Sequence, residues 1–228
     1  QHRCVRTFRQ TMKVAICMAT YEPDPDLFRS QVDSIRAQED VEWTCFVSDD
    51  ASGPGAVEMI EQEIGGDDRF VFSRSERRLG FYRNFERAIG MAPADFELIA
   101  LSDQDDRWYP EKLRTLTGSL GQAGLAYSDQ RLVRPDGKVL EDTYWTVRQN
   151  NFTDIASMLI ANSVTGAASI FTREVAEFAL PFPEVPGDQY HDHWLALVAL
   201  SIGDIEYVDR PLYDYVQHDD AVLGHEKA

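Results

Sequence analysis

Short apolar runs alternate with longer amphipathic stretches through the first half of the chain. The run at 13–19 is apolar and contains β-branched residues, which is typical of a buried strand. The stretch at 24–38 after it carries apolar residues at roughly helical spacing. The whole pattern predicts strands at 13–19, 42–48, 69–73 and 96–102, and helices at 24–38, 56–64, 80–90 and 111–120. Strand-then-helix units in a row predict a parallel sheet with helices on both faces.

The second half of the chain is less regular. Strands are predicted at 125–133 and 138–141, joined by an Asp-Gly turn. The pattern then predicts a strand at 164–172, an apolar helix at 191–201 and a closing strand region at 205–218. The break near residue 122 divides one predicted domain, residues 13–224, into two halves, and the basic segment 1–12 is interpreted as a linker or an upstream segment.

The charge balance narrows the range of partners. The 228 residues carry a formal net charge of -17, which argues against a nucleic acid or an anionic membrane held by charge. A phosphorylated small molecule stays compatible if a metal cation or a few arginines reverse the local field. Cys17 and Cys45 sit inside apolar runs and are predicted to be buried thiols, which favours a reducing cytosol. The sequence shows no apolar run of membrane-spanning length and no signal peptide at its start.

Three polar clusters follow predicted strands, at 19–24, 48–52 and 102–106. Ligands of open parallel sheets bind beyond the carboxyl ends of the strands. Because these three clusters all follow such ends, we expect them to converge on one edge of the sheet, which is stronger evidence for a site than any one cluster alone.

The third cluster favours a divalent cation. The chain has neither a Gly-x-Gly-x-x-Gly after the first strand nor a Gly-x-x-x-x-Gly-Lys-Ser/Thr motif. Arg107 and Trp108 occupy positions where an EF-hand loop would need an oxygen ligand and a glycine. The remaining feature is the carboxylate pair Asp103-Gln104-Asp105, a ligand type suited to Mg²⁺ or Mn²⁺. Asp-rich turns also solvate loops and cap helices, and that simpler interpretation stays open.

The ordered set of these segments resembles the inverting family-2 glycosyltransferases over nearly all of residues 13–224. The matching segments are VAICMATYEPD, FRSQVDSIRAQ, FVSDDAS, RLGFYRNFERAI, ALSDQDDRWYPEKL, SVTGAASIFTREV, HDHWLALVAL and YDYVQHDDAVLG. They look most like bacterial members that build surface polysaccharide, including rhamnosyl transferases. The resemblance implies the α/β GT-A fold, a Rossmann-like and mostly parallel central sheet with helices on both faces and a small antiparallel acceptor-side addition. It also implies a nucleotide-binding half, 13–121, and an acceptor and catalytic half, 122–224.

The resemblance further implies which residues hold the donor. They are Thr20, Tyr21 and Glu22 at the nucleotide base, Asp49 and Asp50 at the base or ribose, and Arg78 and Asn84 in the segment that helps to hold the donor.

For the metal, the resemblance implies Asp105 as the direct ligand, with Asp103 nearer the ribose and His218 approaching the metal or the diphosphate. Asp106 belongs to the same motif, but no role is assigned to it.

For the chemistry, the resemblance implies Asp192 as the general base. The family more often has Glu-Asp where this chain has His191-Asp192. A carboxylate can accept the proton that an acceptor hydroxyl loses as it attacks. Asp192 can equally be interpreted as a cap of the helix that it begins, and the sequence leaves both interpretations open.

The sequence therefore predicts a metal-dependent inverting glycosyltransferase with Mg²⁺ or Mn²⁺ and a UDP- or dTDP-sugar donor. The expected acceptor is a glycan or a lipid-linked hydroxyl, in polysaccharide or glycan synthesis. We expect a cytoplasmic enzyme, which a lipid-linked acceptor would bring to the inner face of the membrane as a peripheral contact. Two alternatives stay open: a sugar nucleotidyltransferase, and a non-catalytic nucleotide-sugar-binding module. That the chain is part of a larger polypeptide also stays open.

Overall fold

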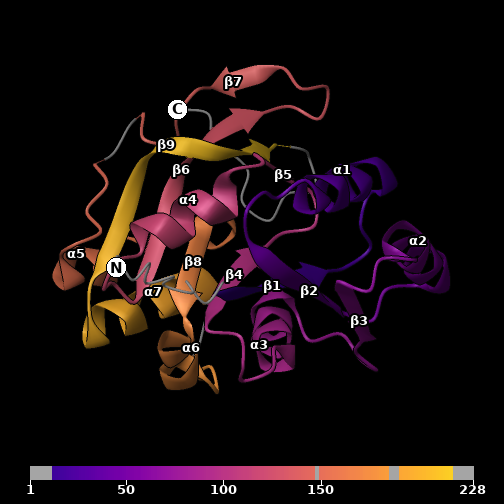
Figure 1. The fold of residues 1–228 in the computed structure, drawn as a ribbon, viewed down its shortest axis with the longest axis horizontal. Helices are drawn as coiled ribbons and strands as arrows, with labels where there is room; N and C mark the ends of the chain where they lie inside the picture. Colours follow the sequence, from indigo (N-terminus) through magenta and orange to yellow (C-terminus); the bar gives the residue numbers. More distant parts are fainter. Residues whose placement is uncertain (1–11, 147–148, 185–189, 218–228) are drawn as a thin grey trace, which may run out of the picture.

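One nine-stranded sheet runs through the centre of the molecule (Figure 1). The computed structural model describes residues 12–146, 149–184 and 190–217. The strands and helices of the first half are β1 (Lys13–Thr20), α1 (Pro25–Arg36), β2 (Glu42–Asp49), α2 (Pro54–Ile64), β3 (Phe70–Arg74), α3 (Phe81–Met91), β4 (Leu98–Ser102), β5 (Arg107–Trp108) and α4 (Lys112–Ser119). Those of the second half are β6 (Leu125–Val133), β7 (Val139–Glu141), α5 (Ile155–Ile160), the 3-10 turn η1 (Gly166–Ala168), β8 (Ser169–Thr172), α6 (Arg173–Ala179), α7 (His191–Ile202) and β9 (Ile205–Val216).

The strand order is β3-β2-β1-β4-β8-β6-β9-β5, with β7 paired to β6. Neighbours among β3, β2, β1 and β4 are parallel, which confirms the sheet predicted from the strand-then-helix pattern. The second half adds antiparallel pairs, because β8 lies antiparallel to both β4 and β6 while β6 and β9 are parallel. Helices α1 and α3 lie on opposite faces of β1 and β2 (Figure 1). The α/β class and its mixed, mostly parallel sheet are as predicted.

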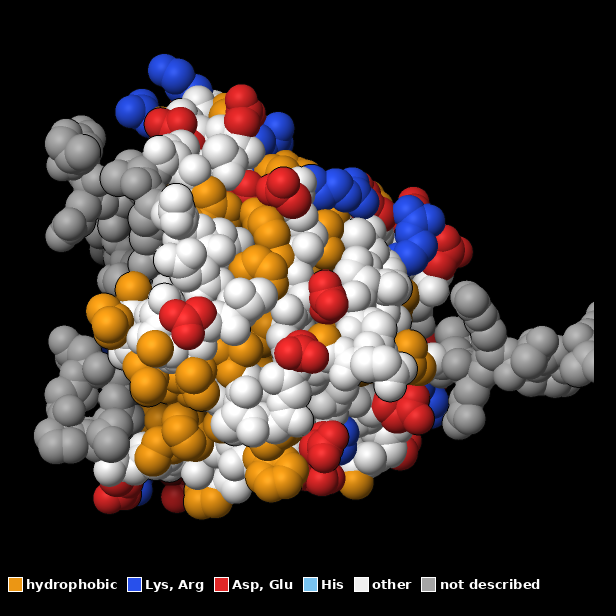
Figure 2. Space-filling model, turned by 90° about the vertical axis from the view of Figure 1, so that its left-hand side faces the viewer, with side chains coloured by type: hydrophobic (Ala, Val, Ile, Leu, Met, Phe, Trp, Pro, Cys, Tyr) orange, Lys and Arg blue, Asp and Glu red, His pale blue; other side chains and the backbone are white. Residues whose placement is uncertain are grey.

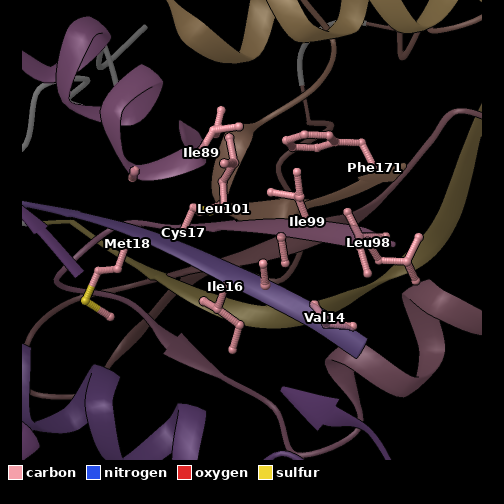
Figure 3. Packing of buried hydrophobic residues seen from close by; sticks show 14 of the residues in the cluster. Val14, Ile16, Cys17, Met18, Ile89, Leu98, Ile99, Leu101 and Phe171 are labelled. Atoms are coloured by element: carbon pink, nitrogen blue, oxygen red, sulfur yellow. The ribbon is translucent and has the colours of Figure 1, made fainter. Parts of the chain in front are cut away.

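The core forms around β1 and β4 because both strands are buried along their length. Ile16 and Leu101 have no exposed surface, and side chains from α3 and β8 pack over the same strands (Figure 3). A strand covered on both faces needs a continuous apolar run instead of an alternating one, and the sequences KVAICMA and LIALS supply it. This packing fixes the carboxyl ends of β1 and β4, from which two of the polar clusters emerge.

Helix α1 begins where the sequence predicts it. The Asp24 side chain accepts hydrogen bonds from the backbone N–H groups of Asp26 and Leu27, and Pro25 occupies the first helical position. An Asp cap of this kind contributes about 1 kcal/mol. The buried face of the helix includes Val32 and Ile35, so the helical spacing seen in the sequence is the spacing of its core contacts.

The strand predicted at 164–172 is wrong in its first half. Residues Gly166–Ala168 form a 3-10 turn, and the strand β8 begins only at Ser169. The small side chains allow this tight turn, in which the N–H of Ala168 donates to the carbonyl of Thr165. The pattern also missed β5, α5 and α6, although Asp154 and Thr172 cap the two helices with their side chains.

Helices α5 and α6 expose apolar side chains. Ile160 is 87% exposed, and Leu159 and Phe178 are each 62% exposed. Figure 2 shows apolar side chains together with Asp and Glu on the side of the molecule where α5 lies. Among the helices of the described residues, none has both the length and the apolar character needed to span a bilayer.

Asp214 on β9 anchors the short strand β5. It is 1% exposed, and its carboxylate accepts hydrogen bonds from Arg107 Nε at 3.0 Å, Arg131 Nε at 2.8 Å and the Tyr109 hydroxyl at 2.6 Å. Arg107 also pairs with Asp214 in the antiparallel register of β5 and β9. Since β5 directly follows the acidic cluster at 102–106, this carboxylate fixes the downstream end of that loop.

We expect the substitution Asp214→Asn to lower the free energy of unfolding by about 1–3 kcal/mol, because Arg107 and Arg131 lose a buried charged acceptor. Chemical denaturation measures the change. The control Glu206→Gln removes an exposed carboxylate from the same strand and should change stability by less than about 0.5 kcal/mol. Equal stability of the two variants would contradict the anchoring role.

Candidate active site

The three polar clusters meet at the carboxyl edge of the sheet, as predicted. Thr20 and Asp49 are register partners at the ends of β1 and β2. Gln104 joins the loop after β4 to the loop after β1, because its Oε1 accepts from Tyr21 N at 2.8 Å and its Nε2 donates to Tyr21 O at 3.2 Å. No role for Gln104 was predicted, and in the structure its side chain holds two of the site loops together.

Asp49 and Asp50, at the end of β2, accept hydrogen bonds from neighbouring segments of the protein. Asp49 is fully buried and accepts from Thr20 Oγ1 at 3.3 Å, from Ser52 N at 2.9 Å and from Ser52 Oγ at 2.5 Å. Asp50 accepts from the N–H of Leu79 at 2.5 Å and of Gly80 at 2.9 Å. Gly80 has a φ of 82°, a conformation that favours glycine, so Asp50 holds the tight entry to α3 in place.

That entry carries Arg78 onto Tyr21. The guanidinium carbon of Arg78 lies 3.6 Å from the centre of the Tyr21 ring. Arginine stacks readily on aromatic faces, and the pair presents planar groups of the kind against which a nucleotide base can stack. The structure therefore brings together two of the residues predicted to bind the donor, although they lie far apart in the chain.

The side chains of Glu22 and Asn84 form hydrogen bonds with backbone groups of neighbouring segments. Glu22 Oε1 accepts from Gly53 N at 2.6 Å, at the start of α2. Asn84 is 2% exposed; its Nδ2 donates to Ser48 O at 2.8 Å and to Thr20 O at 3.3 Å, and its Oδ1 accepts from Ser48 Oγ at 2.6 Å. Asn84 thus ties α3 to the ends of β1 and β2, and contact of either residue with a donor stays a prediction.

The acidic loop after β4 concentrates negative charge in a half-buried position. Burial, together with the charges of Asp105 and Asp192, raises the pKa of Asp103 to about 7, while the charge of Lys112 opposes the shift. Burial also raises the pKa of Asp106 well above its ordinary range, followed by the charges of Asp105 and Asp103. Asp106 turns inward, where its Oδ1 accepts from Val216 N at 3.2 Å. The charge cluster is therefore costly unless a cation is nearby.

The donor set fits a divalent cation only in part. Among the described residues, no group of three acidic, histidine or cysteine side chains is arranged to hold a metal by itself. Mg²⁺ and Mn²⁺ sites often use one or two carboxylates and complete the shell with phosphate oxygens and water. Asp103 and Asp105, together with the raised pKa of Asp103, match such a site. His218, the third predicted ligand, lies outside the described residues.

The charge of Asp192 acts on the acidic loop, where it contributes to the raised pKa of Asp103. It stands in the first turn of α7, and its carboxylate accepts from His193 N at 2.7 Å and from Gly166 N at 3.3 Å. Burial raises its pKa to about 6, against the lowering effect of these two hydrogen bonds and of the His193 side chain. Asp192 is therefore protonated at acidic pH and ionised above about pH 6, which suits a general base near neutrality.

His191 fills the space beside the predicted base. It is 8% exposed, its ring stacks on Phe85 at 3.7 Å between centroids, and burial lowers its pKa to about 3. The imidazole is therefore neutral. Neither ring nitrogen has a hydrogen-bond partner among the described residues, whereas His193 Nε2 contacts Met158 O at 2.7 Å. The two histidines engage different parts of the protein, which does not support a zinc site.

Comparison with known proteins gives one family and several similar folds. Residues 15–177 match the family described as Glycosyl transferase family 2. The structure of S. aureus TarS residues 1–349 with UDP-GlcNAc aligns with a TM-score of 0.72 and 15% identity, over 92% of this chain and 60% of that one. The mannosyltransferase PcManGT from Pyrobaculum calidifontis with GDP-Man and Mn²⁺ aligns with a TM-score of 0.67 and 16% identity, over 94% and 59%.

At these identities the two structures establish the fold alone. The chain spans about three fifths of the length of either structure, 60% and 59%. No curated protein sequence matched the chain.

We expect the substitution Gly166→Ala to lower the free energy of unfolding by about 1–3 kcal/mol. A β-carbon there would lie 2.5 Å from His191 Nε2, and the stacked ring has little room to give way. Thermal or chemical denaturation measures the loss. The control Gly118→Ala meets nothing within 4 Å inside helix α4 and should leave stability unchanged or raise it by up to about 1 kcal/mol. A Gly166→Ala protein as stable as this control would refute the close packing.

Proposed function

Because the chain belongs to glycosyl transferase family 2 and has the GT-A fold, we propose that it is a metal-dependent inverting enzyme that uses a nucleoside-diphosphate sugar. The chain is a glycosyltransferase, as its family predicts. Membership of that family disfavours the sugar nucleotidyltransferase and the non-catalytic module that the sequence left open. The metal, the inversion and the particular substrates are the proposal.

One observation carries this proposal: the acidic loop and Asp192 share the edge at which β1, β2 and β4 end. The charge of Asp192 contributes to the raised pKa of Asp103, although Asp103 follows β4 and Asp192 stands in the first turn of α7, far apart in the chain. An inverting transferase needs a group that stabilises the negative charge on the leaving diphosphate. It also needs a base that accepts the proton of the acceptor, on the opposite side of the sugar carbon. The acidic loop and Asp192 are suitable for these two tasks.

The nucleotide would lie against the loops after β1 and β2. We propose that the stacked pair Tyr21 and Arg78 forms one wall of the base pocket, with Thr20, Glu22 and Asp49 bordering it. Asp50 would act indirectly, because its carboxylate already holds the loop that carries Arg78. Asn84 would likewise support the pocket by bracing α3 against β1 and β2.

Asp105, with Asp103 beside it, would hold Mg²⁺ or Mn²⁺, which when bound neutralises charge on a leaving diphosphate. The inward position of Asp106 supports a different role for that residue, since its hydrogen bond from Val216 N ties the loop to β9. The Mn²⁺ in the mannosyltransferase structure and the nucleotide sugars in both similar structures are consistent with this class of ligand.

Asp192 would accept the proton of the attacking acceptor hydroxyl. The hydrogen bonds from Gly166 N and His193 N orient its carboxylate, and neutral His191 adds no charge beside it. Direct attack opposite the leaving group, with no covalent intermediate on the protein, inverts the sugar carbon. We further propose a glycan or lipid-linked acceptor in polysaccharide synthesis, a cytoplasmic location with a peripheral contact at the membrane, and residues 13–121 and 122–224 as donor and acceptor halves.

Divalent metal should strengthen nucleotide binding. We expect Mn²⁺ or Mg²⁺ to raise the affinity for UDP or dTDP at least tenfold in calorimetry, about 1.4 kcal/mol, relative to EDTA. Asp105→Asn should abolish most of this increment, because it removes the carboxylate assigned to the metal. Asp95→Asn, an exposed carboxylate on the loop before β4, is the control and should keep it. The same affinity with metal and with EDTA would count against the metal site.

Removing the base should stop turnover and spare binding. With a panel of UDP-, dTDP- and GDP-sugars, we expect release of free nucleoside diphosphate, and Asp192→Asn should lower kcat by about 10²–10⁴-fold. Donor affinity should change less than about threefold, since a base acts on the acceptor. The kcat of the unmodified chain should rise with pH through the pKa of about 6 and then level off, because the carboxylate must be ionised.

Asp204→Asn, an exposed residue after the far end of α7, is the matched control and should keep full turnover. Full activity of Asp192→Asn would remove Asp192 from the mechanism. Binding of nucleotide sugars without any turnover would support the binding module instead.

A further inference from the structure

Lys112 is a buried lysine that the proposed chemistry does not use. It stands at the start of α4, and it has no exposed surface. Its Nζ lies 3.7 Å from the centre of the Trp108 ring and 4.3 Å from the centre of the Tyr213 ring. The same nitrogen donates a hydrogen bond to the carbonyl oxygen of Ala167. A lysine in this position needs an explanation, because chains rarely bury an ammonium group without a partner.

Its surroundings are unusually negative. Two aromatic faces and a carbonyl oxygen line its position, and Asp106 and Asp103 act on it through space. Burial lowers the pKa of Lys112 well below its ordinary range, while the two carboxylates oppose that shift. One Asp106 oxygen, Oδ2, is buried without a hydrogen-bond partner among the described residues. The lysine therefore joins the electrostatic environment of the acidic loop while its ammonium group contacts a carbonyl oxygen and two aromatic rings.

The contacts of Lys112 belong to different parts of the site. Trp108 is in β5, two residues after Asp106, and Tyr213 is its register partner in β9. Ala167 is in the 3-10 turn η1, whose first residue, Gly166, donates its N–H to Asp192. One side chain thus connects the segment that leaves the acidic loop to the turn that orients Asp192, although the two are more than 50 residues apart in the chain.

We propose that Lys112 is a positioning residue for sugar transfer, which holds the turn η1 and through it Asp192 in register with the acidic loop. This inference rests on the proposed role of Asp192 as the base. Lys112 does not contact the substrate in this account. It acts by fixing the carbonyl of Ala167, so that the N–H of Gly166 keeps the Asp192 carboxylate aimed at the site.

The competing explanation is that Lys112 only fills the core. Methionine has nearly the same length and would keep the contact with the two rings, but it can neither donate to Ala167 nor carry charge. If Lys112 only fills space, Lys112→Met should be stable and fully active. If it positions the base, the variant should remain folded and bind nucleotide, and should turn over slowly.

A double-mutant cycle separates these roles, with the donor identified by the nucleotide-sugar panel and with UDP and Mn²⁺ as the binding probe. We expect Lys112→Met to lower kcat at least tenfold while the KM for donor and the affinity for UDP stay within threefold. In the Asp192→Asn background, where the base is already absent, Lys112→Met should lower kcat less than twofold further. Lys138→Met, an exposed lysine beside β7, is the control and should leave kcat unchanged.

An unchanged kcat in Lys112→Met, or losses that multiply in the double variant, would overturn the positioning role. Full activity of Asp192→Asn alone would instead refute the proposed base, so the two failures can be told apart. If Lys112→Met does not fold, Lys112→Gln replaces it in the same double-mutant cycle, with the same expected losses in kcat. The glutamine side chain is neutral, and it is shorter than lysine, so it no longer extends as far toward the carbonyl of Ala167.

Discussion

Repulsion among three carboxylates within four residues is the constraint on which the site depends. Asp103, Asp105 and Asp106 follow directly on the buried strand β4, where water can screen them only in part. The fold offsets this repulsion in part, because the N–H of Val216 donates to Asp106 and the charge of Lys112 opposes the raised pKa values of Asp103 and Asp106. Gln104 holds the loop in place through its hydrogen bonds with Tyr21. These groups come from different parts of the chain, and in the proposed function a divalent cation with a diphosphate would occupy the remaining side.

Fewer charged groups lie around Asp192 than in the acidic loop. Asp192 and His191 begin α7, and the imidazole is neutral because its burial between Phe85 and the turn η1 disfavours the charged form. A glutamate, which the family more often has at the position of His191, would add a further negative charge beside Asp192. The neutral ring leaves Asp192 as the one carboxylate of that pair, with a pKa of about 6 set by its own burial and its two backbone hydrogen bonds.

The local sequence predicts most strands of the first half and the polar clusters after them. It does not predict the long-range contacts that hold Asp106 and Lys112 in place. The apolar runs place β1 to β4 correctly, and β1, β2 and β4 are largely buried, whereas β3 is only partly buried. The polar clusters after β1, β2 and β4 had to converge once these strands were parallel. Asp106 is different, because its partner Val216 lies 110 residues away, and no periodicity specifies such a pairing. Lys112 is similar: its position in the first turn of a helix is typical of a solvated residue, and only the fold of β9 and η1 encloses it. The short helices α5 and α6 were not predicted, because six or seven residues make too few turns for a helical period of apolar residues to be recognised.

The most direct test of the account is a crystal structure with UDP and Mn²⁺, in which anomalous scattering locates the metal. The proposed site predicts a manganese peak in contact with the Asp105 carboxylate and the UDP diphosphate. It also predicts that the uracil lies against Tyr21 and Arg78 and that Asp192 faces the diphosphate across the open edge. A nucleotide bound away from the ends of β1, β2 and β4, or a metal without contact to the acidic loop, would contradict it.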